Sequence, residues 1–158
     1  MATEQLQSSN GTKFGYSRGN GNILTQFLNI YKAIGALQGK AFILDGEIVA
    51  LDEAGRPSFT LLQSIRKNKR PLMSYVFDLL HQNCERLLRL PLRERRKRLE
   101  AAFPADSLPQ HVRLSPVLTG WLANIIAQVK KLELEGVIAK RLDSLYEPGQ
   151  RSIQGKHC

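Results

Sequence analysis

Short apolar runs interrupted by charged residues are the feature that most constrains how this chain can fold. They lie at 41–51, 72–80 and 135–141, and most of their apolar residues favour β-strands. Between them, apolar residues recur at helical spacing. This irregular alternation of strands and helices predicts an α+β domain of antiparallel sheets with flanking helices, in which charged strand positions line a sheet-built pocket.

The first run carries two carboxylates, Asp45 and Glu47, within an otherwise apolar strand. Residues two apart in a strand point to the same face. Buried carboxylates cost free energy unless they meet a metal, a hydroxyl or a cation, so this face is a candidate site. The Asp-Gly pair is also typical of a type I′ hairpin turn, but the Asp-Glu-Ala-Gly-Arg-Pro segment at 52–57 is the better turn.

The last run places a carboxylate, Glu135, before a short apolar strand and Lys140 after it. We expect the residues at 137–139 to be buried. A carboxylate can bind Mg²⁺ and a lysine suits a phosphate. Strict alternation puts the two charges on opposite faces, so they share a ligand only across a strand end or a twist, which Gly136 permits. The alternative is a sheet edge with solvated charges.

Helices are predicted where the spacing of apolar residues is about 3.6. They cover 25–37, ending near Gly39; a short segment capped by Ser58 that continues to about 66; 91–102; and 119–132. The helix at 91–102 carries many arginines, which we expect to form a solvated face, with a patch for the DNA backbone as the alternative. A further strand is expected at 111–118, at an edge because it contains Pro116.

Composition favours a polyanionic partner. Lys and Arg number 23 against 14 acidic residues, a formal net charge of +9. Such an excess attracts nucleic acid or an anionic membrane surface, and nucleic acid is the preferred reading. No apolar stretch approaches a membrane span of about 20 residues, and the N-terminus does not resemble a secretory signal. Cys84 and Cys158 are far apart, which fits a reducing cytosol.

The 158 residues fit one domain with irregular ends. Residues 1–22 are rich in Gly, Asn, Ser, Thr and Gln, which predicts an irregular, partly disordered segment, with an edge strand at most near 13–18. The domain is expected at 23–152, followed by a short basic tail at 153–158.

Three motifs then combine into a resemblance. Asp-Gly-Glu at 45–47, Tyr-Val-Phe-Asp-Leu-Leu at 75–80 and Glu-Gly-Val-Ile-Ala-Lys at 135–140 occur in the order and rough spacing of the nucleotidyltransferase motifs of ATP-dependent DNA ligases. The connecting segments resemble the ligase domain of bacterial ligases linked to non-homologous end joining, from about residue 40 to residue 152. The resemblance implies an incomplete nucleotidyltransferase (adenylation) fold.

The resemblance also implies a reaction, which joins nicks during DNA repair or recombination in three steps. A lysine attacks the α-phosphate of ATP, AMP passes to a 5′-phosphate at a nick, and the 3′-hydroxyl displaces AMP. It implies ATP with Mg²⁺ or Mn²⁺, DNA with nicks or ends, associated repair proteins as partners, no membrane, and a location in the bacterial cytosol at the nucleoid. The implied nucleotide-binding residues are Arg18, Glu47 at the ribose, Phe77 stacked on adenine, Lys140 near the phosphates, and Lys156; Glu135 is the implied metal ligand.

The sequence departs from the family pattern at both ends. The family's nucleophile lies in Lys-x-Asp-Gly-x-Arg, which only the Lys13 segment echoes, without the Asp and only five residues before Arg18. No catalytic lysine is therefore predicted. Of the family's last motif, Trp-x-Lys-x-Lys, only a part is present, around Lys156. The chain also stops before an oligonucleotide-binding domain. We expect a truncated adenylation domain that is not competent alone. The alternatives are a non-enzymatic remnant that binds nucleic acid or a partner, and an RNA ligase or capping enzyme.

Overall fold

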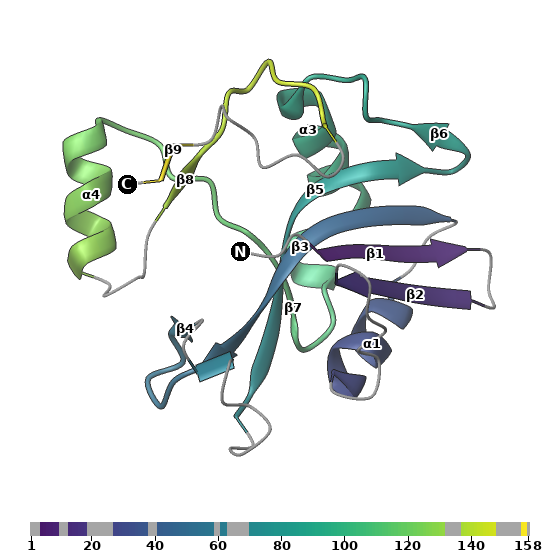
Figure 1. The fold of residues 1–158 in the computed structure, drawn as a ribbon, viewed down its shortest axis with the longest axis horizontal. Helices are drawn as coiled ribbons and strands as arrows, with labels where there is room; N and C mark the ends of the chain where they lie inside the picture. The colour runs from purple at the N-terminus through teal and green to yellow at the C-terminus, as the bar shows by residue number, and fades with distance from the viewer. Residues whose placement is uncertain are drawn as a thin grey trace.

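A mixed sheet forms the centre of the protein. The computed structural model describes residues 4–9, 13–18, 27–37, 41–58, 61–62, 70–131, 137–147 and 156–157. The sheet has the strand order β2-β1-β3-β5-β6, with β4 added to β3 and β7 to β5 (Figure 1). Its strands are β1 (Glu4–Ser9), β2 (Lys13–Arg18), β3 (Phe42–Leu51), β4 (Pro57–Ser58), β5 (Leu72–Gln82), β6 (Glu85–Arg86) and β7 (Val112–Leu114). Only β7 pairs in parallel among these strands of the described residues.

Helices lie beside the sheet, and a smaller unit stands at one end. The helices are α1 (Leu28–Gly35), α3 (Leu92–Ala102), α4 (Leu122–Lys131) and a short 3₁₀ turn, Ala105–Ser107. In Figure 1, α1 lies near β1 and β2, and α3 lies near β5. At the left of that view, α4 stands beside a separate two-stranded sheet of β8 (Ile138–Ala139) and β9 (Lys156–His157). No helix among the described residues is long and apolar enough to span a bilayer.

The hydrophobic core joins α1 and α3 to the central strands. Its fully buried side chains recur at helical spacing in the helices and line both β3 and β5, as the sequence pattern predicts. They include Ile30 and Ile34 of α1, Leu44 and Ile48 of β3, Val76 and Leu79 of β5, and Leu99 of α3. Phe42 and Phe103 meet edge to face, with their ring centroids 5.2 Å apart, and close the core between β3 and the end of α3.

The pairing of β3 with β5 is irregular where the Asp-Gly-Glu motif lies. Asp45 is opposite Asp78, but the next residue, Gly46, is opposite Val76. Phe77 is therefore an extra residue on β5, in a register shift of the kind that a β-bulge produces. Bulges turn a side chain out of the regular alternation, and here the affected residue is the predicted adenine-stacking phenylalanine.

Gly46 permits this close approach of the two strands. A Cβ atom at this position would lie 2.7 Å from the carbonyl oxygen of Tyr75, which is backbone and cannot move cheaply. The Asp-Gly pair is thus part of a strand, as predicted, and the turn is formed by the next segment. There Asp52 accepts hydrogen bonds from the backbone N–H groups of Ala54 and Arg56, and Gly55 has φ +76°.

Several sequence predictions need correction. The segment 1–22 is not irregular throughout, since β1 and β2 form a hairpin that continues the sheet from β3; β2 is the expected edge strand. Strand β5 continues beyond the expected end at residue 80 to Gln82, and the strand expected at 111–118 is only Val112–Leu114. Polar and glycine-rich composition at the N-terminus does not prevent strand pairing when a neighbouring strand supplies backbone partners.

The C-terminal elements differ more strongly from expectation. The strand at 137–139 is not buried, because Ile138 is 43% exposed and Ala139 is also exposed. Helix α4 forms as predicted, yet Trp121 just before it is 83% exposed and only Val129 of the helix is buried. The expected stop at Gly39, the helix beyond Leu62 and Cys158 lie outside the described residues. Leu61 and Leu62 are helical, and Ser58 Oγ accepts a hydrogen bond from Leu61 N–H.

Candidate functional site

Phe77 and Lys140 meet across the two parts of the molecule. The ammonium nitrogen of Lys140 lies 4.0 Å from the centroid of the Phe77 ring, a cation–π contact. Phe77 comes from the register shift of β5, and Lys140 directly follows β8. An aromatic face next to a lysine is suited to a purine base with phosphates attached, since the ring stacks on the base and the ammonium attracts the phosphates.

The residue after Phe77 is held by a buried ion pair. Arg95 of α3 donates two hydrogen bonds to Asp78, from Nε to Oδ1 at 2.8 Å and from Nη2 to Oδ2 at 2.9 Å. Both side chains are only 2% exposed. A bidentate guanidinium–carboxylate pair fixes the relative orientation of its partners. It therefore anchors β5 to α3 one residue from the ring that faces Lys140.

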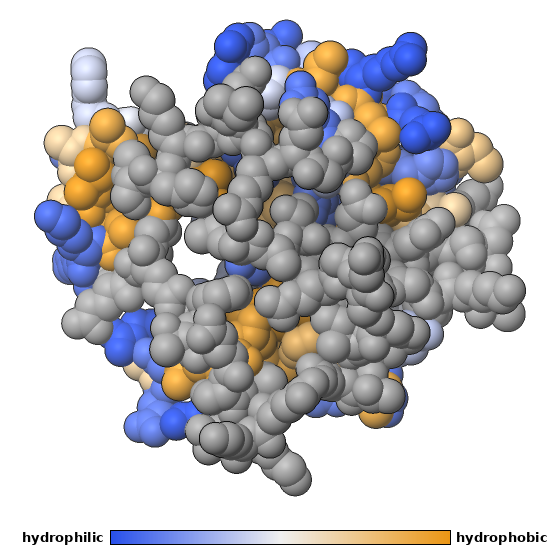
Figure 2. Space-filling model, in the orientation of Figure 1, coloured by the Kyte–Doolittle hydropathy of each residue, from blue (hydrophilic) through white to orange (hydrophobic). Residues whose placement is uncertain are grey.

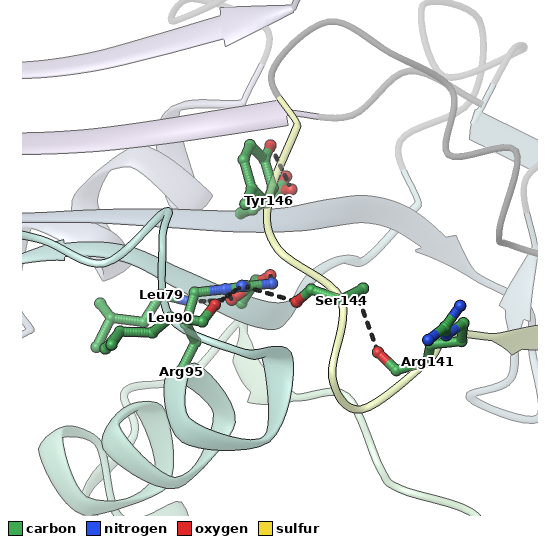
Figure 3. A network of polar contacts seen from close by, with 8 residues as sticks. Leu79, Leu90, Arg95, Arg141, Ser144 and Tyr146 are labelled. Carbon is green, nitrogen blue, oxygen red and sulfur yellow. Dashed lines mark hydrogen bonds and ion pairs between the residues drawn. The ribbon is translucent and has the colours of Figure 1, made fainter.

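The residues after Lys140 are attached to the same helix. Backbone hydrogen bonds tie this segment to α3 and the turn before it: Leu92 N donates to Ser144 O at 2.9 Å, Arg93 N to Leu142 O at 2.9 Å, and Tyr146 N to Leu88 O at 3.1 Å. Arg95 Nη1 also donates to Ser144 O, at 3.3 Å, and to Leu90 O. Figure 3 shows Arg95 between the strand and this segment, with Ser144 bonded in turn to Arg141.

Asp45 is the second buried carboxylate of the site. It lies directly across from Asp78 and is 1% exposed, and Tyr146 donates its hydroxyl proton to Oδ2 at 2.9 Å (Figure 3). Burial raises the pKa of Asp45 to about 7, against the lowering effects of the Tyr146 hydrogen bond and of Lys140. The Tyr146 hydroxyl and the Lys140 cation are the kinds of partner that offset the cost of burying a carboxylate in this strand, as the sequence predicts.

Only some of the predicted site residues have side chains in the described part of the structure. Glu47 is half-buried on β3, opposite Tyr75. The backbone of Arg18 pairs with Glu4, and that of Lys156 pairs with Ala139, next to Lys140. The side chains of Arg18 and Lys156, and that of Lys13, lie outside the described part of the chain, as does Glu135 entirely. A cavity shared by Glu47, Phe77 and Glu135 therefore stays a prediction.

A metal site is not formed by the described residues. Among them, no group of three or more His, Cys, Asp or Glu side chains is placed to hold an ion. Both oxygens of Asp78 are bound by Arg95, and one oxygen of Asp45 is bound by Tyr146. The predicted metal ligand, Glu135, is outside the described residues, so its role stays a prediction.

Sequence reasoning missed Arg95 as a site-supporting residue. It assigned the arginines of this helix to a solvated face, which is wrong for Arg95. A signal was present, because Arg95 lies three residues after Leu92 and four before Leu99, on the same face as these buried leucines. Sequence reasoning also missed Tyr146, whose hydroxyl donates a hydrogen bond to Asp45 of β3.

Comparison with known proteins agrees with this geometry. The model of the family described as "ATP dependent DNA ligase domain" matches residues 4–154. The chain is 39% identical over 123 residues to the multifunctional non-homologous end joining protein LigD of Mycolicibacterium smegmatis, a match that covers 77% of this chain and 16% of the relative. The chain thus spans about a sixth of the length of these LigD relatives.

Solved structures give the same result. The ligase domain of LigD from M. tuberculosis superposes with a TM-score of 0.83 at 30% identity, covering 99% of this chain and 50% of that one. A mycobacterial DNA ligase D complexed with ATP superposes with a TM-score of 0.78, again at 30% identity and with 99% and 50% of the two chains covered. These matches confirm the predicted α+β nucleotidyltransferase fold.

Proposed function

The chain belongs to the ATP-dependent DNA ligase domain family, and from this membership and the site we propose that it forms the nucleotide pocket of a DNA-joining adenylation domain. The contact between Lys140 and the ring of Phe77 carries the proposal. In the proposed complex, Phe77 stacks on adenine, Lys140 approaches the phosphates and Glu47 approaches the ribose. Arg18 and Lys156 complete the nucleotide contacts.

Binding of the base changes the partner of Lys140. One face of the Phe77 ring cannot hold the ammonium and a purine together, so a base that stacks on this face displaces Lys140. The side chain of Lys140 is exposed and carries its charge on a flexible stem, so it can turn toward the phosphates at little cost. The exchange replaces a cation–π contact with base stacking and a charge–phosphate contact.

The metal is part of the proposal through Glu135. Mg²⁺ is commonly held by one or two carboxylates together with substrate phosphates, and Mn²⁺ takes similar oxygen ligands. When bound, the ion neutralises negative charge that develops on the phosphates. Glu135 lies a few residues before β8 in the sequence, and Lys140 directly follows β8. This closeness to Lys140 in the sequence supports the assignment of Glu135 as the metal ligand.

DNA with nicks or ends is the proposed acceptor of AMP. A net charge of +9 favours a polyanion, and the family name points to DNA. We further propose that the protein acts in end joining or recombination with repair proteins as partners, in the bacterial cytosol at the nucleoid, because the LigD relatives are named for end joining.

Calorimetric titration with Mg-ATP and with adenosine tests the pocket. Phe77→Ala should weaken both ligands by about 1–3 kcal/mol, the usual effect of losing one base–aromatic stack. Lys140→Ala should weaken ATP but not adenosine, since its contact is with the phosphates. Lys130→Ala, which removes an exposed lysine of α4, is the matched control and should leave both affinities unchanged. A wild-type chain that binds neither ligand would overturn the proposal.

Incubation with α-labelled ATP and Mg²⁺ tests the covalent step. We expect little or no acid-stable AMP on the protein, because this sequence has no Lys-x-Asp-Gly motif. An adduct in stoichiometric yield that disappears in Lys13→Ala would show that the expectation is wrong and would identify the nucleophile.

The second candidate function is nucleic-acid binding without catalysis, which the net charge of +9 favours. Binding to nicked DNA that weakens steeply with salt, together with no thermal shift on adding ATP, would select it over the nucleotide pocket.

A further inference from the structure

A closed circuit of contacts connects the two residues that face each other in the site. Phe77 is adjacent to Asp78 in the chain, Asp78 accepts hydrogen bonds from Arg95, and Arg95 donates a hydrogen bond to the carbonyl of Ser144. Ser144 donates through both its backbone N–H and its hydroxyl to the carbonyl of Arg141, at 3.1 and 2.7 Å. Arg141 follows Lys140, which returns to the Phe77 ring.

Arg95 is the junction of this circuit. It is 2% exposed, and its Nε and Nη2 are used by Asp78, while Nη1 donates to Ser144 O and Leu90 O. A planar guanidinium has donors in fixed directions, so it can bind a carboxylate on one side and a carbonyl on another at the same time. A lysine ammonium is a point charge and cannot reproduce this fork.

We propose that Arg95, held by Asp78, is a positioning residue that sets where Lys140 meets the phosphates of a bound nucleotide. Its action passes through the carbonyl of Ser144 and the turn at 141–144, and it touches neither Lys140 nor the base. The proposal rests on the nucleotide pocket proposed above. Other ties of the segment, such as the hydrogen bond from Tyr146 to Asp45, keep it attached when Arg95 is changed, so the expected effect is on placement and not on attachment.

The ratio of ATP affinity to adenosine affinity separates positioning from general damage. Lost stability weakens both ligands, whereas a displaced Lys140 weakens only the ligand with phosphates. In Arg95→Lys we expect this ratio to fall about tenfold, as for the loss of one hydrogen bond to a charged group. Arg98→Lys is the matched control on the same helix; its exposed pair with Glu85 lies outside the circuit, and the ratio should not change.

A double-mutant cycle tests whether Arg95 acts through Lys140. If it does, Arg95→Lys causes no further fall in the ratio once Lys140→Ala is present. If Arg95→Lys does not fold, the double variant Asp78→Leu with Arg95→Met replaces the pair by apolar groups of similar size, which proteins commonly tolerate, and still removes the donor to Ser144.

The outcomes are distinct. A folded Arg95→Lys or Asp78→Leu/Arg95→Met variant with an unchanged ratio overturns the inference and leaves the nucleotide pocket standing. An equal further fall in the Lys140→Ala background also overturns it, since Arg95 would then act by another route. A wild-type chain that binds neither ATP nor adenosine overturns the proposed function itself, and the inference with it.

Discussion

The two halves of the candidate site are built in different ways. Phe77 comes from the pairing of β3 with β5, where the neighbouring residues Val76, Asp78 and Leu79 are fully buried. Lys140 comes from the region of α4 and β8, whose apolar side chains are largely on the surface. In Figure 2 this end, at the left of the view, shows hydrophobic and hydrophilic surface side by side.

The two halves of the site are held in place by different interactions, which suit their different roles. The aromatic half is fixed by core packing, which tolerates little change. The cationic half is held by a few hydrogen bonds to α3, so its position depends on those bonds. An aromatic platform needs a fixed orientation to stack a base, whereas a lysine that exchanges a ring for phosphates needs freedom to move. Substitutions in the two halves should therefore differ in their effect on stability.

The largest loss of stability is expected from breaking the buried ion pair. Asp78→Ala leaves the guanidinium of Arg95 buried without its carboxylate, which should lower the free energy of unfolding by about 3–5 kcal/mol. Urea unfolding monitored by circular dichroism measures it. Glu85→Ala, which removes the exposed partner of Arg98, should cost less than about 1 kcal/mol. Equal losses in the two variants would mean that the buried and the exposed ion pair are equally solvated, which contradicts the burial of Asp78 and Arg95.

A smaller loss is expected from filling the close contact of β3 with β5. The Cβ atom of Gly46→Ala meets the Tyr75 carbonyl, so the strands must separate where Phe77 lies. Overpacking of this kind costs about 1–3 kcal/mol. The same unfolding experiment measures it, and the variant should also bind adenosine more weakly. A variant as stable as the wild type would show that the strands adjust without strain.

Residue patterns predicted the aromatic half of the site well. The strands at 41–51 and 72–80, the helix at 91–102 and the inclusion of Asp45 in the strand all follow from local periodicity and are confirmed. The register shift that singles out Phe77 could not be predicted, because it depends on which residues of two distant strands pair. Sequence alone placed Gly46 inside the strand, but it could not predict the close approach of the Tyr75 carbonyl.

The cationic half was predicted less well, for a physical reason. Apolar spacing indicates which face of an element is suited to burial, but not whether a partner covers it. Trp121 and Ile138 have the pattern of core residues and are exposed. Conversely, Arg95 carries a charge and is buried, because a carboxylate from a strand 17 residues earlier neutralises it. Such long-range partners decide burial, and local periodicity carries no information about them.

The buried carboxylate of the aromatic half should make stability depend on pH. The pKa of Asp45 is raised from 3.8 to about 7 by burial, with Asp78 adding to the rise. Between these values the folded state binds the proton more tightly than the unfolded state, so Asp45 stabilises the fold at low pH and this contribution is lost as the pH rises through about 7. The slope contributed by one group is at most ~1.4 kcal/mol per pH unit. Asp45→Asn should flatten it in urea titrations from pH 4 to pH 8.

The matched control for this slope is a half-buried aspartate whose pKa is shifted in the opposite direction. The backbone N–H and the guanidinium of Arg56 lower the pKa of Asp52, so its contribution is present above its ordinary value of 3.8 and is lost as the pH falls. Asp52→Asn should leave the decline between pH 4 and pH 7 unchanged. If that decline persists in Asp45→Asn, another group is responsible for it.

The smallest effect is expected at the most exposed aromatic residue of the cationic half. Trp121→Ala should change the free energy of unfolding by less than about 0.5 kcal/mol, because a side chain that is 83% exposed loses little contact on truncation. Trp121 is also the single tryptophan, so its fluorescence reports on this position alone. Its emission should match that of a tryptophan in water, and acrylamide should quench it as it quenches the free amino acid. A loss above about 2 kcal/mol, or a shielded emission, would place α4 against a covering surface, and the contrast between the two halves would then have to be given up.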